Sequence, residues 1–270
     1  MPHPRMNNDN KNTLIVAGVV FAIFLIGAII FGVYTAKQNS TVQTITQEST
    51  TQVPSQSTAT SNASNADSNE NASNNVAQAP QDYTQNVKEL LQFPIMQGGC
   101  EITSLTCNLN ALGFEVEQED IADNYLVYAE DDDWSVGYSG DPYYNGFGFP
   151  ACIVSTANAY LADQGDMGAQ FEAIELKGES FDALLEYVNQ GWPVIVWTTM
   201  YFSTPWKTGL TMGDYEWYEN EHCVVLYGTD EDGDLLIMDP IDGLVTRSAN
   251  RFAIIYEDCG SMGVLISSKK

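Results

Sequence analysis

Residues 38–82 contain no aromatic side chain and consist almost entirely of Ser, Thr, Asn, Gln and Ala. A segment of this composition cannot bury enough apolar surface to offset the conformational entropy lost on folding. We therefore expect residues 35–82 to form a disordered linker. The folded part is then confined to residues 83–270, which hold every tryptophan and every tyrosine except Tyr34. This length suits one domain with a hydrophobic core.

Residues 14–33, LIVAGVVFAIFLIGAIIFGV, are uncharged and apolar throughout. As a helix, about 20 such residues span a bilayer. The run is longer than the apolar core of a signal peptide, roughly 7–15 residues, and lacks a small-x-small cleavage site, so we expect an uncleaved anchor over residues 13–34. Arg5 and Lys11 precede it and Lys37 follows, which favours a cytoplasmic tail over residues 1–12 and an extracellular domain. The linker suits a Gram-positive cell surface.

The formal net charge of −26 makes nucleic acid and anionic membrane surfaces poor partners. The acidic run at residues 130–133 lacks the ligand spacing of a calcium loop, and we expect no metal site and no cofactor. Five cysteines, an odd number, indicate at least one free thiol. We expect mostly reduced, buried cysteines, because a domain of this size needs no disulfide framework.

Hydrophobic spacing divides the domain into a helical first half and a second half rich in strands. Helices are expected over residues 100–112, 150–164 and 181–190, with a shorter one within 118–128; Gly113, Pro150, Ser180 and Gly191 supply their start and stop signals. Strands are expected at 193–199, 222–228, 234–239, 251–256 and 263–267. Helices followed by an antiparallel sheet predict an α+β fold.

Cys100 follows Gly98 and Gly99 and stands at the start of the first expected helix. A helix N-terminus stabilises a thiolate and lowers the pKa of a cysteine placed there. The two glycines would let the backbone approach a substrate closely. These features suit a nucleophile that attacks a carbonyl, although a small core residue in a capped helix fits this stretch equally well.

His222 is the only histidine in residues 83–270, so a Cys–His pair would have to use it as the base. It opens an expected strand, where its side chain could point into a cleft. If Thr229 pairs with Asp234 across the turn, Asp239 lies on the same face as His222 and within reach. A one-residue bulge would instead favour Asp242 as the residue that orients the imidazole.

The motifs GCEITSL, LNALG, GDPYYNGFGFP, GWPVIVW, HCVVLYG and IMDP follow one another in this order across nearly the whole domain. In this the chain resembles the stand-alone, papain-like cysteine peptidases related to the bacteriocin-processing peptidases, the C39-like group. The resemblance implies Cys100 as nucleophile, His222 as base and Asp239 as the orienting acid. It also implies an upstream glutamine as oxyanion donor; we assign Gln97, with Gln92 as its competitor.

The resulting prediction is a membrane-anchored extracellular cysteine peptidase with a papain-like fold that hydrolyses peptide or protein substrates. Its substrate would contact Gly98, Gly99, Tyr143, Tyr144 and Phe147. One alternative is an amidase or endopeptidase that cuts peptidoglycan stem peptides by the same chemistry. The other is a non-catalytic papain-like domain whose aromatic loop binds a surface partner.

Overall fold

The computed structural model describes residues 81–131 and 133–269. The predicted cytoplasmic tail, the membrane anchor and all of the linker up to residue 80 lie outside the described residues. Among the residues that are described, no helix is both long enough and apolar enough to cross a bilayer.

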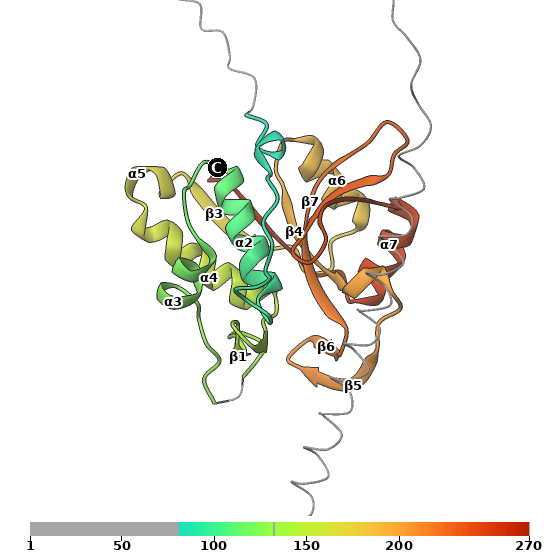
Figure 1. Cartoon of the computed structure of the whole chain (residues 1–270), viewed down its shortest axis with the longest axis horizontal. Helices are drawn as coiled ribbons and strands as arrows, with labels where there is room; N and C mark the ends of the chain where they lie inside the picture. Colours follow the sequence, from blue (N-terminus) through green and yellow to red (C-terminus); the bar gives the residue numbers. More distant parts are fainter. Residues whose placement is uncertain (1–80, 132, 270) are drawn as a thin grey trace, which may run out of the picture. The chain divides into compact units, whose positions relative to one another are not determined.

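A six-stranded antiparallel sheet forms the centre of the domain (Figure 1). Its spatial order is β3 (Phe171–Glu175), β10 (Gly263–Ser268), β4 (Val194–Thr199), β7 (Glu221–Thr229), β8 (Leu235–Asp239) and β9 (Gly243–Arg247). Every neighbouring pair in this sheet is antiparallel. The α+β class predicted from the sequence is confirmed.

Helices cover both faces of this sheet. The helices are α2 (Cys100–Ala111), α3 (Gln118–Asn124), α4 (Pro150–Asp163), α5 (Gly165–Gly168), α6 (Phe181–Asn189) and α7 (Ala249–Asp258), with short 3-10 turns η1 (Thr84–Asn86) and η2 (Met200–Phe202). One face packs against α2 and α4, and the other against α6 and α7.

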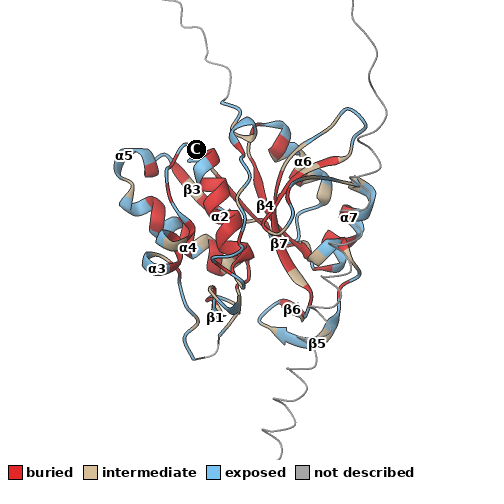
Figure 2. Cartoon of the chain, in the orientation of Figure 1, coloured by how far each residue is buried: buried red, intermediate tan, exposed pale blue. Residues whose placement is uncertain are grey.

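The central strands show why two helical layers are needed. All six residues of β4 are buried. Ile195 and Trp197 pack with the α2 side, whereas Val194 and Val196 pack with the α6 and α7 side. Because successive side chains of a strand point to opposite faces, a strand that is apolar throughout must be covered on both. Figure 2 shows α2, β4 and β7 buried along most of their lengths.

The structure corrects the expected order of elements. Residues 251–256, expected as a strand, lie within helix α7, where Phe252, Ile255 and Tyr256 are buried at the spacing of a helix. Strand β3 lies among the helices of the first half, and β9 and two small hairpins were also missed. The helices and strands are therefore interleaved rather than placed in two successive blocks.

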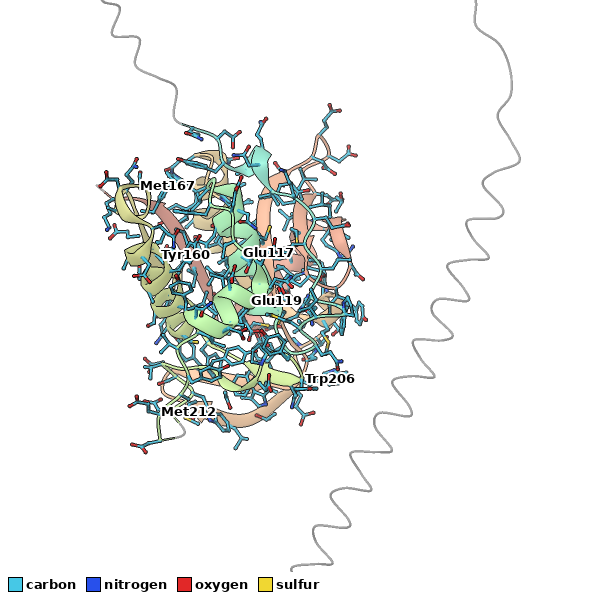
Figure 3. The ribbon with its side chains drawn as sticks, turned by 60° about the vertical axis from the view of Figure 1, so that its left-hand side comes forward. Glu117, Glu119, Tyr160, Met167, Trp206 and Met212 are labelled. Carbon is cyan, nitrogen blue, oxygen red and sulfur yellow. The ribbon has the colours of Figure 1, made fainter. Side chains whose placement is uncertain are left out.

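The two small hairpins are β1 (Ser139–Asp141) with β2 (Asn145–Phe147), and β5 (Lys207–Met212) with β6 (Tyr215–Tyr218). Figure 1 shows both at the end of the domain where α2 begins and β7 starts. Figure 3 labels Trp206, just before β5, and Met212, at its end, along this same side of the domain. The hairpins therefore border the region that carries Cys100 and His222.

Candidate active site

Cys100 is the first residue of α2, as expected from the sequence, and its residue exposure is 8%. Gly99 occupies the N-cap, and no side chain caps the helix there. The first amides of the helix are therefore not occupied by a capping side chain, which leaves them available to an anionic group. Ser104, one turn along α2, donates to the carbonyl of Cys223 at 3.1 Å and ties this helix to β7.

The two glycines before Cys100 have a packing role. A Cβ on Gly98 would lie 2.5 Å from the backbone nitrogen of Gly146, and one on Gly99 would lie 2.8 Å from Cβ of Met96. The carbonyl of Gly98 also accepts a hydrogen bond from the hydroxyl of Tyr138 at 2.5 Å. This close approach holds the β1–β2 hairpin against the start of α2.

The thiol of Cys100 donates to Oε2 of Glu101 at 3.3 Å. A carboxylate oxygen of Glu221 also lies within 4.8 Å of both groups. Burial, followed by the charges of Glu101 and Glu221, raises the pKa of the Cys100 thiol well above its ordinary value, against a backbone hydrogen bond from Cys223 that lowers it. The sequence predicted a lowered pKa from the helix start; the two carboxyl groups reverse that expectation.

The two carboxyl groups are themselves shifted toward their neutral forms. Burial raises the pKa of Glu101 to about 7, although the amide of Gly148 and the charge of His222 act in the opposite direction. Burial and the neighbouring Glu101 raise the pKa of Glu221 well above its ordinary value. Neither glutamate was predicted as a site residue, because the sequence carries no signal for them beyond their positions beside Cys100 and His222.

His222 and Asp239 form a buried pair. Nε2 of His222 lies 2.7 Å from Oδ1 of Asp239, and both side chains are 2% exposed. Burial opposes the charge of Asp239, but the hydrogen bond from His222 and the backbone amides of Ile241 and Asp242 hold the pKa of this carboxyl below its ordinary value. Asp239 is thus kept ionised against the imidazole, which leaves Nδ1 of His222 for another partner.

The strand register explains which aspartate meets His222. Thr229 pairs with Leu235, so the predicted pairing of Thr229 with Asp234 is wrong by one residue. A bulge between Leu226 and Gly228 then restores the predicted register, and Val225 pairs with Met238. The competing Asp242 instead binds Arg247 at 2.8 Å.

The two glutamines before Cys100 differ sharply in setting. The side chain of Gln97 is exposed, whereas Gln92 is 4% exposed. Nε2 of Gln92 donates to the carbonyl of Gln97 at 3.0 Å, and its backbone amide donates to the carbonyl of Pro240, next to Asp239. Gln92 therefore connects the loop before Cys100 with the end of the strand that carries Asp239.

The aromatic residues predicted to contact substrate have different environments. Tyr144 is 74% exposed, while the hydroxyl of Tyr143 donates to Asp123 at 2.7 Å. Phe147 packs against Trp217 of β6 with ring centroids 4.0 Å apart. The ring contact joins the two hairpins at the border of the site, and Trp217 was missed because only the fold brings it to Phe147.

The remaining cysteines do not form disulfides. All five are free and buried, as expected. Cys107 lies two turns along α2 from Cys100 and lines a cavity of about 570 Å³ with Phe114 and Val116. None of the predicted site residues lines this cavity, so we do not assign it to the same site.

Comparisons with known proteins identify the family to which the domain is similar. Residues 78–264 match the sequence profile described as the Peptidase_C39 like family. The chain is 30% identical over 191 residues to the uncharacterised protein YvpB of Bacillus subtilis, covering 64% of this chain and 70% of YvpB. A Bacillus anthracis protein described as a C39-like peptidase superposes with a TM-score of 0.56 at 25% identity, covering 68% of this chain and 96% of that structure.

Proposed function

Because this chain belongs to the Peptidase_C39 like family, we propose that it is a cysteine peptidase in which Cys100 attacks the peptide carbonyl. The observation that carries the proposal is the buried pair of His222 and Asp239, 2.7 Å apart, in a domain whose α2 begins at Cys100. Asp239 occupies Nε2 of the imidazole, so Nδ1 is the nitrogen that takes the thiol proton. Cys100, His222 and Asp239 would thus act as nucleophile, base and orienting acid, the three roles of a hydrolytic triad.

The reaction proceeds through two acyl-transfer steps. Cys100, having passed its proton to His222, forms a bond to the carbonyl carbon and creates an oxyanion. The imidazolium then protonates the leaving amine, and the C–N bond breaks to leave a thioester on Cys100. Water, deprotonated by His222, attacks this thioester and releases the carboxylic acid.

Gln92 is the better candidate for the oxyanion donor than Gln97. Its amide is buried and fixed by the carbonyl of Gln97, whereas the side chain of Gln97 faces solvent. A donor must be held in place before charge develops if it is to stabilise the transition state. The backbone amides at the start of α2 supply the second part of the oxyanion site.

The location of the reaction is a further part of the proposal. The apolar run over residues 14–33 would anchor the chain in the cell membrane, with the peptidase domain outside. Extracellular peptides and the stem peptides of peptidoglycan are then the two substrate classes to compare.

The full-length protein should be incubated with a library of linear peptides and with muropeptides, and new amino termini detected by mass spectrometry. We expect cleavage that is lost in Cys100→Ala and His222→Ala and kept in Cys259→Ala, which removes another buried thiol. Gln92→Ala should lower kcat by roughly 10²–10³, the cost of one oxyanion donor, while Gln97→Ala should change it little. Cleavage that survives in folded Cys100→Ala would overturn the assignment.

A further inference from the structure

Two acidic side chains beside the nucleophile, one buried and one half-buried, have no part in the proposed reaction. They are Glu101, the residue after Cys100, and Glu221, the residue before His222. The sulfur of Cys100 and one carboxylate oxygen of each glutamate all lie within 4.8 Å of one another. Three potential anions are thus gathered in one largely buried place, where such charges are costly unless they are compensated.

Glu101 is held in a fixed orientation. Its Oε1 accepts from the backbone amide of Gly148 at 2.6 Å, and the carbonyl of Gly148 in turn accepts from the indole of Trp197 at 3.0 Å. Glu101 and Trp197 are both fully buried. The arrangement leaves Oε2 directed at the thiol of Cys100. In metal sites, groups that hydrogen-bond to a ligand without touching the metal orient that ligand and raise the affinity of the site for the metal.

Glu221 provides a second, separate observation. Its Oε1 is buried and has no hydrogen-bond partner among the described residues. A buried oxygen without a partner costs free energy, on the order of 1–3 kcal/mol, so native structures rarely keep one without a ligand or water. Glu221 belongs to the same group of three side chains, so this incompletely paired carboxyl group lies beside Cys100.

We propose that Cys100, Glu101 and Glu221 form a binding site for a thiophilic divalent cation of the zinc class, which blocks the nucleophile when bound. One thiolate and two carboxylates are ligands that Zn²⁺ accepts, and a fourth position stays open to water. Metal–ligand distances of about 2.0–2.3 Å place the ligand atoms of a tetrahedral site roughly 3.4–3.6 Å apart. Cys100 and Glu101 are already 3.3 Å apart, so small side-chain rotations of Glu221 complete the site.

The charge balance also favours a cation. Binding releases the thiol proton and any protons on the two carboxyl groups to solvent, so three negative ligands meet a doubly positive ion. Calcium and magnesium fit poorly, since they require six or more oxygen ligands or several retained waters and do not prefer sulfur. The blocking effect rests on the proposed function of Cys100, but the binding itself does not.

Cobalt(II) is a suitable probe because it takes the same ligands as zinc, and its bond to a thiolate gives a charge-transfer absorption in the near ultraviolet. The full-length protein, freed of metal, should be titrated with Co²⁺ at pH 7.5 and then with Zn²⁺. We expect one Co²⁺ per chain with this absorption, and its loss as Zn²⁺ displaces the cobalt. Bound Zn²⁺ should also slow alkylation of Cys100 at least tenfold, measured by mass spectrometry.

Three variants and one control make the assignment specific. Cys100→Ser should abolish the thiolate absorption, and Glu101→Gln and Glu221→Gln, which keep the side-chain shape, should each weaken Co²⁺ binding at least tenfold. Glu216→Gln, on β6 outside the group, should bind as the wild type does. The proposal is overturned if the absorption is absent, or if both folded glutamine variants keep wild-type affinity. A wild-type protein that binds Co²⁺ but cleaves no peptide would count against the proposed function alone.

Discussion

His222 meets Asp239 because of a single extra residue in β7. The turn brings the strands together one residue out of the predicted register, and the bulge at Tyr227 corrects it before the strand reaches His222. A bulge changes which side chains share a face, so one residue decides between Asp239 and Asp242. The structure resolves the choice left open by the sequence: Asp239 faces the imidazole and Asp242 faces Arg247.

This contact predicts different outcomes for the two aspartates. Asp239→Ala should lower kcat about a hundredfold, because the imidazole loses the group that fixes its tautomer; the loss in serine triads is about 10⁴. A cysteine depends less on this group, since a thiol is more acidic than a hydroxyl. Asp242→Ala should keep kcat within a few-fold. Peptide hydrolysis by the two variants, with folding checked by circular dichroism, measures the difference, and a larger loss in Asp242→Ala would contradict it.

At the scale of elements, the helix that carries Cys100 depends on its contact with the β1–β2 hairpin. A methyl group at Gly98 would meet the backbone nitrogen of Gly146 at 2.5 Å and Cα of Asn145 at 2.9 Å. Backbone cannot rotate away as a flexible side chain can, so the hairpin itself must move. The same hairpin carries Phe147, whose ring meets Trp217, and therefore any displacement reaches the aromatic border of the site.

Gly98→Ala should accordingly destabilise the domain by about 1–3 kcal/mol through overpacking. It should also raise KM for peptide substrates. Gly228→Ala is a matched control, because its new methyl group would meet only the side chain of Leu236, at 3.1 Å. Urea unfolding and steady-state kinetics of both variants test this, and equal behaviour of the two would show that the hairpin contact is unimportant.

Local sequence signals predicted some of the helices correctly but not the features that depend on tertiary packing. Starts and stops such as Pro150 and Ser180 placed α4 and α6 correctly, because caps act within one turn. Residues 251–256 were misread because a short apolar run fits a strand or a buried helix, and tertiary packing decides. Glu101 and Glu221 were missed for a related reason: they are 120 positions apart in the chain, and only the packing of α2 on β7 makes them neighbours.

At the scale of the whole molecule, acidic side chains far outnumber basic ones. The chain has a formal net charge of −26, which counts Glu101 as an anion, although the buried carboxyl of Glu101 ionises only as the pH passes about 7. A group whose pKa is higher in the folded state than in the unfolded state favours folding below its unfolded pKa. That contribution is lost as the pH rises toward the folded value. For Glu101 the loss falls between about pH 4.5 and pH 7.

We therefore expect the free energy of unfolding of the metal-free protein to decrease from pH 4.5 to pH 7. The part due to Glu101 is on the order of 3 kcal/mol, from 1.36 kcal/mol per pKa unit. Glu101→Gln imitates the protonated acid and keeps an acceptor for Gly148, so this part of the slope should disappear in the variant. Urea unfolding across this pH range, in a buffer that contains a chelator, gives the free energy of unfolding of the wild type and of the variant. Parallel curves would mean that Glu101 ionises in the folded protein as readily as in the unfolded chain.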